Sequence, residues 1–514
     1  MAITAAVYDD EPLPDTVYVE GMVNFHGEKM NHNGGFGGWK SVIRVIAVGS
    51  IDSFIFYGMA SNLISLLTTK LGQSTATAAV NINAWSGFVY LLPLLTSFVA
   101  DSYLGRFRTI LFSLLIYISG LVLLTLYTSL QSASCSKNAK YIISCSSPST
   151  LQLFFCFSSL YLVGIGSAVC KTCAPAFGAD QFDELNPGES KSKSSFFNWW
   201  QIGLSVGASS SHLVLNYVQD NLGWGLAFGI SCITMVTALI VFLSGIKSYR
   251  YILKSDHKEK KETLSNIFKV VLPLLPLWII CLMYTVVDAQ NVTFFTKQGS
   301  TMDRSIGRPG FKIPAAAIQS LIGLSIILFT ALYDRAFVPF ARAFTGKPNG
   351  ITTLQRIGGG IVISAISMVI AAIVEHRRLR IALESGLIAN KTATVPMAVW
   401  WLIPQYVLSG LAIVFTSVGL LEFFYDEVPN ELRSVGLSLY STVFGIGSLL
   451  SGLLISVIQK VTSAGGEYGW FASNINQGHL DYFYWLLAGL DLVGFVALLC
   501  FSKFYVYKRK APMS

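Results

Sequence analysis

The stretch KSYRYILKSDHKEKKETLSNIFK, residues 247–269, lies at the middle of the 514-residue chain and carries seven Lys or Arg residues. Outward from this basic block, in both directions, the sequence alternates polar connections with runs of about 20 mostly apolar residues, the length that a helix needs to cross a bilayer. Six such runs stand on each side of the block. Because unpaired backbone groups cannot be left in hydrocarbon, these runs predict helices. The predicted fold class is an all-α integral membrane protein with twelve transmembrane helices.

The predicted organisation has two six-helix bundles, 39–246 and 270–503, joined by the short basic linker 247–269. A solvated acidic tail, 1–38, precedes the first bundle, and a basic tail, 504–514, follows the second. The predicted spans cover residues 42–67, 78–100, 110–130, 151–174, 196–218, 226–246, 270–295, 313–332, 357–374, 397–424, 435–458 and 483–501.

The composition excludes several classes of protein. Hydrophobic residues make up 53% of the chain and charged residues only 12%, whereas about 25% of a soluble domain is charged. An ordinary cytosolic enzyme, a disordered regulator and a secreted disulfide scaffold are thereby excluded. Since the sequence shows no catalytic constellation, no metal-ligand spacing and no nucleotide phosphate-binding motif, we expect no enzyme activity, no metal and no cofactor. The net charge of +8 is modest, and its clusters between apolar runs favour a lipid bilayer over nucleic acid as partner.

The basic residues of the loops also predict the orientation. With both termini on one side, that side holds 23 Lys or Arg residues and the other holds 12, so the positive-inside rule predicts cytosolic termini. On the opposite side, Asn390 begins a glycosylation-type triplet, which is a weak signal because such triplets are frequent. Cys135 and Cys145 share one loop on that side, and a disulfide between them is left open.

Ionisable side chains at bilayer depth are costly and usually face a cavity or a partner. Lys171, in the middle of the fourth predicted span, either extends to a membrane interface or lines a water-filled path, where it binds an anionic group or pairs with Asp52 of the first span. The candidate residues for substrate binding and proton coupling are Asp52, Tyr57, Lys171, Asp288 and Glu422. Glu422 stands near the cytosolic end of its span, which favours a gate or interface role. The remaining intramembrane groups, His212 and Asp491, are more typical of helix–helix hydrogen bonds.

The connection between the second and third spans reads ADSYLGRFRT, residues 100–109. It resembles the cytosolic signature of major-facilitator carriers, with Asp101, Gly105, Arg106 and Arg108 at the matching positions. An Asp at a helix end and two Arg in a tight turn can form charge pairs that hold a cytosolic gate in one of two states.

Further segments resemble the plant nitrate/peptide transporter family, the proton-dependent oligopeptide transporters of the major facilitator superfamily. The resemblance implies two six-helix bundles with a central cavity, rocking alternating access, and proton-driven movement of nitrate, di- and tripeptides or other small anionic plant metabolites. It also implies the plasma membrane or the vacuolar membrane, as a monomer or a homodimer. The segments that carry the resemblance are residues 81–87, 177–183, 195–200, 289–290, 293–295, 298–299, 302–304, 404–406, 421–425 and 433–434.

Three positions depart from the family pattern. Proton-coupled members usually carry Glu-x-x-Glu-Arg/Lys in the first span, where this chain has Gly49 and then Asp52 followed by Ser53. The acidic residue that members often carry in the tenth span is Ile413 here. Asp288 stands where some nitrate-transporting relatives have histidine, and an ionised aspartate repels nitrate. The linker 247–269 is also shorter than is usual in the family.

The departures leave three hypotheses. The chain is a working carrier with altered or absent proton coupling, or an ordinary proton symporter that tolerates the losses. The third hypothesis is a transport-inactive paralogue that acts as a sensor or binding subunit. A membrane-embedded enzyme has no residues in its favour.

Overall fold

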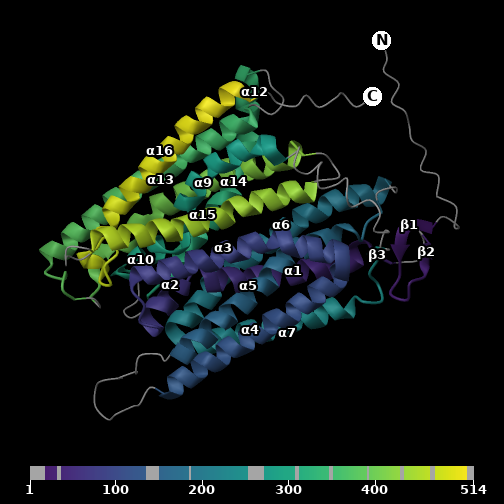
Figure 1. The fold of residues 1–514 in the computed structure, drawn as a ribbon, viewed down its shortest axis with the longest axis horizontal. Helices are drawn as coiled ribbons and strands as arrows, with labels where there is room; N and C mark the ends of the chain where they lie inside the picture. Colours follow the sequence, from purple (N-terminus) through teal and green to yellow (C-terminus); the bar gives the residue numbers. More distant parts are fainter. Residues whose placement is uncertain are drawn as a thin grey trace.

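The structure is a computed structural model. It describes residues 18–31, 36–134, 150–183, 187–252, 271–306, 312–345, 351–390, 393–428, 433–463 and 469–505. Eleven helical segments in these ranges are long and apolar enough to cross a membrane. A twelfth, α6 (Pro187–Tyr217), has the length, and its polar first turns, which include Glu189, lower its hydropathy. The predicted all-α membrane class is confirmed (Figure 1).

The N-terminal half is a bundle in which α1 packs against α6, while α4 packs against both α5 and α7. The second helix, α3, packs on α5 and closes the bundle toward the other half. The remaining bounds are α1 (Gly38–Ala60), α2 (Leu63–Ser65), α3 (Thr75–Val99), α4 (Arg106–Ser134), α5 (Thr150–Ala179) and α7 (Trp224–Ser244).

The C-terminal half forms a second bundle, in which α13 packs against α14 and α16, and α9 packs against α15 and α16. Its first span is broken: α9 ends at Asp288, a 3-10 turn covers Ala289–Val292, and α10 then continues. The bounds are α9 (Leu275–Asp288), α10 (Phe294–Ser300), α11 (Ser320–Leu332), α12 (Val338–Thr345), α13 (Thr353–Glu384), α14 (Ile403–Asp426), α15 (Arg433–Thr462) and α16 (Leu480–Phe504).

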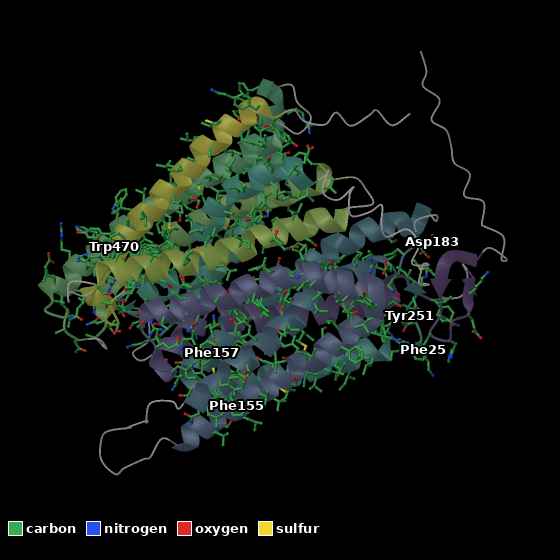
Figure 2. All side chains as sticks on the ribbon, viewed as in Figure 1. Phe25, Phe155, Phe157, Asp183, Tyr251 and Trp470 are labelled. Atoms are coloured by element: carbon green, nitrogen blue, oxygen red, sulfur yellow. The ribbon has the colours of Figure 1, made fainter. Side chains whose placement is uncertain are left out.

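A small sheet includes residues 18–31 of the predicted solvated tail and residues 251–252 of the predicted linker. Strand β1 (Tyr18–Val23) pairs antiparallel with β2 (Lys29–Asn31) and with β3 (Tyr251–Ile252). The ring of Phe25 lies 6.2 Å from that of Tyr251 (Figure 2). The linker residue Arg250 is buried and forms an ion pair with Glu189 at 2.7 Å. These contacts fix residues 18–31 and 250–252 to the N-terminal half.

The two halves meet chiefly where α3 packs along α15. Two glycines make this close approach possible. A Cβ on Gly87 would lie 2.7 Å from Leu449 and 2.9 Å from the carbonyl oxygen of Gly445. Toward one end of this contact, the Asn83 amide donates to the Ser451 hydroxyl at 3.0 Å.

Polar contacts between the halves gather, among the residues described, at the end where α1 ends and α16 begins, called the outer end below. The Gln319 amide donates to the carbonyl oxygen of Ser61 at 2.9 Å, and the Lys297 ammonium donates to the Thr68 hydroxyl at 3.2 Å. At the opposite, inner end, α12 and the β1–β3 sheet stand far apart (Figure 1). The halves are thus linked at the outer end.

One ion pair between the halves also lies at the outer end, just beyond α6. The Arg304 guanidinium is 3.7 Å from Asp220, and the two side chains are 22% and 25% exposed. The Asn62 amide donates to the same carboxylate at 2.9 Å. Burial raises the pKa of the Asp220 carboxyl, and the Asn62 hydrogen bond and the Arg304 charge partly offset that rise.

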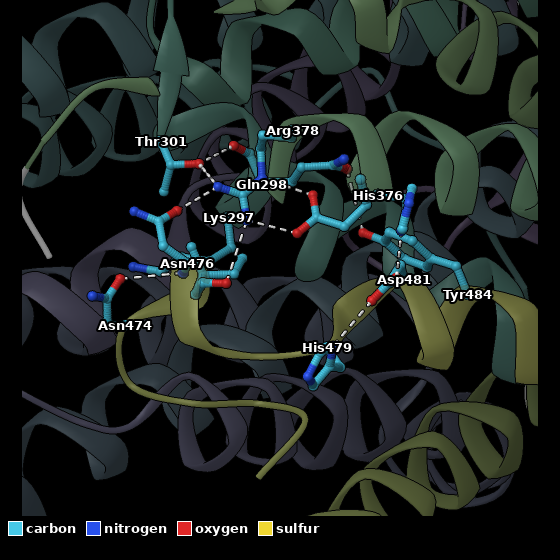
Figure 3. A network of polar contacts seen from close by, with 12 residues as sticks. Lys297, Gln298, Thr301, His376, Arg378, Asn474, Asn476, His479, Asp481 and Tyr484 are labelled. Atoms are coloured by element: carbon cyan, nitrogen blue, oxygen red, sulfur yellow. Dashed lines mark hydrogen bonds and ion pairs between the residues drawn. The ribbon is translucent and has the colours of Figure 1, made fainter. Parts of the chain in front are cut away.

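A buried polar network fixes the outer end of α13 (Figure 3). Arg378 forms an ion pair with Glu375 at 2.6 Å, and both side chains are completely buried. Arg378 also donates to Asn476 at 2.5 Å and to Thr301 at 3.2 Å. The predicted span 357–374 ends before this arginine, whereas α13 continues to Glu384. The helix can stay buried at this depth because the carboxylate neutralises the guanidinium one turn away.

Candidate functional site

The Lys171 ammonium lies on the aromatic face of α1. Its Nζ is 3.0 Å from the centroid of the Phe56 ring and 5.3 Å from that of Tyr57. Because residues four apart share a helix face, Asp52 lies on the same side of α1 as Phe56, and it is within electrostatic range of Lys171. The other face of the Phe56 ring stacks on Trp85 of α3, at 5.3 Å between centroids. The structure therefore places the ammonium against the aromatic side chains of the first span.

Asp52 has few groups to stabilise its charge. It is 1% exposed, and the Tyr117 and Ser167 hydroxyls lie beside it. In the part of the chain described, Asp52 Oδ1 and both of these hydroxyls have no hydrogen-bond partner. The neighbouring cation is Lys171. A change in the position or charge of Lys171 therefore acts directly on the protonation of Asp52.

Three tyrosines and Asp288 bring both halves to the same region. Tyr57 of α1, Tyr90 of α3 and Tyr440 of α15 are all within electrostatic range of Asp288. Tyr57 is 36% exposed. Asp288 ends α9, and its Oδ1 accepts a hydrogen bond from Asn291 at 2.9 Å. The break after α9 thus places a carboxylate from the C-terminal half opposite the aromatic side chains that flank Lys171.

Glu422 lies near the inner end of α14, where its carboxylate forms an ion pair with Arg356 at 3.0 Å. Arg356 also donates to the carbonyl oxygen of Val414 at 2.9 Å and lies 4.4 Å from the Tyr333 ring centroid. The predicted span 357–374 begins just after Arg356, whereas α13 begins at Thr353 and includes this arginine. Glu422 belongs to this inner-end ion pair within the C-terminal half.

The motif between α3 and α4 forms a tight connection at the inner end. Gly105 has a φ of 79°, a conformation that glycine adopts without strain. Arg106 pairs with Asp180, just after α5, at 2.6 Å, and Arg108 is exposed. The side chain of Asp101 lies outside the described residues, so its expected pairing stays a prediction.

The remaining predicted residues are Asn390, the two loop cysteines and His212, and of these His212 lies beside the site. Asn390 is exposed in the connection after α13. Cys135 and Cys145 lie outside the described residues. His212 is 9% exposed, and its ring contacts that of Tyr57 at 6.4 Å.

Sequence reasoning missed the aromatic residues of the site. Phe56, Tyr90 and Tyr440 have no charge, and aromatic residues are common in apolar helices, so nothing in the pattern separated them from packing residues. One signal was present for Phe56, since it follows Asp52 by one helical turn.

Comparisons with known proteins support one family. The PTR2 model of the POT family matches residues 107–261 and 251–471. Protein NRT1/PTR FAMILY 5.10 of Arabidopsis thaliana is 49% identical over 527 residues, which cover 92% of this chain and 94% of the relative. Protein NRT1/PTR FAMILY 5.14 of the same plant is 47% identical over 532 residues, with the same coverage. The crystal structure of the POT family transporter PepTSo matches with a TM-score of 0.72 and 18% identity, over 90% of this chain and 98% of that chain, which shows the same fold. The chain therefore belongs to the POT family of membrane transporters.

Proposed function

We propose that this transporter moves small solutes by alternating access, with proton coupling that differs from that of relatives with an intact acidic motif in the first span. The substrate classes are nitrate, di- and tripeptides or other small plant metabolites. The observation that carries the proposal is the position of Lys171, whose ammonium is within electrostatic range of Asp52 and 5.3 Å from the ring centroid of the partly exposed Tyr57. A cation in this position can bind an anionic group of the solute.

The moving parts would be the bundles 39–246 and 270–503, with 247–269 as linker and 1–38 and 504–514 as tails. The outer-end contacts of Gln319 and Arg304 support a state that is closed on the outside. We propose cytosolic termini, in the plasma membrane or the vacuolar membrane, for a monomer or homodimer. The Arg106 and Arg356 ion pairs then belong to the cytosolic gate.

The coupling step follows from the position of Asp52, whose neighbouring cation is Lys171. When a solute anion binds Lys171, Asp52 shares its counter-charge, and the ionised carboxylate becomes more costly. Uptake of a proton by Asp52 relieves that cost. Departure of the solute restores the pair and releases the proton. Since Asp52 is the one acid left of the usual first-span motif, we expect a weaker dependence on the pH gradient than in relatives with the full motif.

The test uses purified protein in liposomes, offered nitrate, dipeptides and small organic anions side by side. Two structural neighbours are described as complexes with sulfate and with 5-aminolevulinic acid, so both compounds belong in the panel. Lys171→Ala should abolish uptake while leaving membrane insertion intact. Lys460→Ala, at the outer end of α15, is the matched control. Unchanged uptake by Lys171→Ala would remove this lysine from the mechanism.

The alternative is a transport-inactive paralogue that acts as a sensor or binding subunit. It is favoured by the absence of family acids at Gly49 and Ile413. The same liposomes separate the two functions. A sensor binds a solute of the panel, with an affinity that Lys171→Ala lowers, but shows no flux of any solute under any gradient.

A further inference from the structure

Asp491 is a buried acid that the function proposed above does not use. It lies in the middle of α16 and is 0% exposed. In the part of the chain that the structure describes, neither of its carboxyl oxygens has a partner within ordinary hydrogen-bond geometry, although Ser364 lies beside the carboxyl. The helix–helix hydrogen bond expected from the sequence is therefore not formed with ordinary geometry. A carboxylate without a hydrogen bond or a cation is very costly in an apolar interior, whereas a protonated carboxyl group is tolerated.

The ionisable groups of the neighbouring helices leave Asp491 with one charged neighbour. On α9 that neighbour is Asp288, which is within electrostatic range, and the Tyr284 phenol lies within range of both acids. On α16 itself, Asp481 and Lys503 are ten and twelve residues away, or about 15 and 18 Å along the helix. The ionisable groups of α13 lie toward its ends, at least eight residues from Ser364: Arg356, Glu375, His376, Arg377, Arg378, Arg380 and Glu384.

Ser364 joins the two acids. It lies beside the Asp491 carboxyl and also lines a cavity of about 10 Å³ together with Asp288, Tyr284 and Ser409. A cavity of about 10–15 Å³ has room for one water molecule, provided that polar groups surround it. Here two hydroxyls, a phenol and a carboxylate do so. The close approach of α16 to α9 depends on Gly494, where a Cβ would lie 3.2 Å from Met283.

We propose that Asp491 and Asp288 form a proton-binding site of two carboxyl groups in the C-terminal half, bridged by Ser364 and the small cavity beside it. The site holds one proton when the transporter is ready to bind solute and two after proton uptake. Of the two acids, Asp288 lies nearer the proposed solute site, since it is within electrostatic range of Tyr57 and Tyr440. This inference rests on the proposed transport function and supplies a coupling group in place of the acids missing from the first and tenth spans.

The transfer between the two acids is balanced. The O–H bond of the protonated Asp288 breaks, and its proton passes to the bridging oxygen. That oxygen gives up its own proton, which forms the O–H bond of Asp491. No electron is transferred. The negative charge moves from Asp491 to Asp288, and so toward the region where Lys171 and the tyrosines lie.

Infrared spectroscopy tests the site without any substrate. Purified protein is titrated in lipid, and the carbonyl stretch of protonated carboxyl groups is followed. Asp491→Asn should remove one buried band, and it should change the pH at which the band of Asp288 is lost, because the two acids share a proton. Asp481→Asn, a buried acid at the start of the same helix, is the control and should do neither. Spectra in which Asp491→Asn removes no band overturn the proposal.

Transport supplies the second readout. A one-unit pH gradient drives up to about tenfold accumulation for each coupled proton. In Asp491→Asn we expect this accumulation to fall below that of the wild type, with the coupling through Asp52 remaining, while exchange of labelled for unlabelled solute continues, since exchange needs no net proton movement. Gradient-driven accumulation equal to that of the wild type and of Asp481→Asn contradicts the site. If the wild type shows no flux at all, the proposed function fails, but the infrared titration still decides on the carboxyl pair.

A variant that breaks only the bridge guards against misfolding. Ser364→Ala keeps both acids and removes one hydroxyl. We expect both carboxyl bands to persist and to titrate independently. Bands that stay coupled in Ser364→Ala, as they are in the wild type, overturn the role of this serine as the bridge.

Discussion

The completely buried ion pair between Arg378 and Glu375 leads to a prediction about stability. Replacing Arg378 by methionine keeps most of the side-chain volume but leaves the Glu375 carboxylate without its cation, at a position where neither side chain is exposed. Removing one partner of a buried pair costs about 3–5 kcal/mol, because the remaining charge is left without compensation. The lost hydrogen bonds to Asn476 and Thr301 act in the same direction. We therefore expect Arg378→Met to lower the free energy of unfolding by about 3–5 kcal/mol.

The assay is a denaturant titration in mixed micelles. Arg380→Met, two residues further along α13 and exposed, is the matched control and should change the free energy of unfolding by no more than about 0.5 kcal/mol. The double variant Glu375→Gln with Arg378→Met contains no unpaired charge and should recover more than half of the loss. A loss below about 1 kcal/mol, the size expected for a surface pair, would refute the reasoning. So would a double variant no more stable than Arg378→Met alone.

Three further predictions concern other parts of the fold. Phe56→Leu should weaken solute uptake, whereas Phe56→Tyr should retain it. The reason is that only an aromatic ring offers a face to the Lys171 ammonium, and such a contact contributes about 0.5–2 kcal/mol. Equal uptake by both variants in liposomes would contradict this role. Burial raises the pKa of Asp220 above its usual 3.8, so the folded protein binds this proton more tightly than the unfolded chain and loses stability as the pH rises just above that value. Asp220→Asn should flatten the dependence of the unfolding free energy on pH in that acidic range, and an unchanged curve would show that the group does not contribute. Gly87→Ala should lower the free energy of unfolding by about 1–3 kcal/mol, because the added methyl group pushes α3 away from α15. Gly229→Ala, where a Cβ would have open space around it, is the control and should not lower it measurably. Similar melting temperatures for the two variants would contradict the packing described.

The sequence predicted the membrane fold because apolar run length reports bilayer thickness directly. The predicted span boundaries were wrong where charged residues were taken to lie outside a helix. Arg356 and Arg378 both lie inside α13, where Glu422 and Glu375 neutralise them. A pairing across helices, such as that of Arg356 with Glu422, depends on packing that spacing along the chain does not reveal. The pairing of Arg378 with Glu375 was accessible in principle, since the two are three residues apart on one helix face.

The residues of the candidate site were likewise only partly predictable from the sequence. Lys171 and Asp52 were identifiable because a charge at bilayer depth is rare. Tyr90 and Tyr440 were not, because only the packing of α3 along α15 brings them near Asp288. The strands β1 and β2 were missed because they are short and lie in a region that is acidic overall, and because β1 pairs with β3, a strand more than 200 residues away.

The sheet that fixes residues 18–31 to the N-terminal half gives the molecule a built-in reference point for optical measurement. Phe25 is 53% exposed on this sheet, and Phe504, at the end of α16, is 85% exposed on the other half. Dyes attached at these two positions, both at the inner end of the molecule, would travel with separate bundles. Energy transfer between them would follow the opening of single molecules in real time, without any label near the solute.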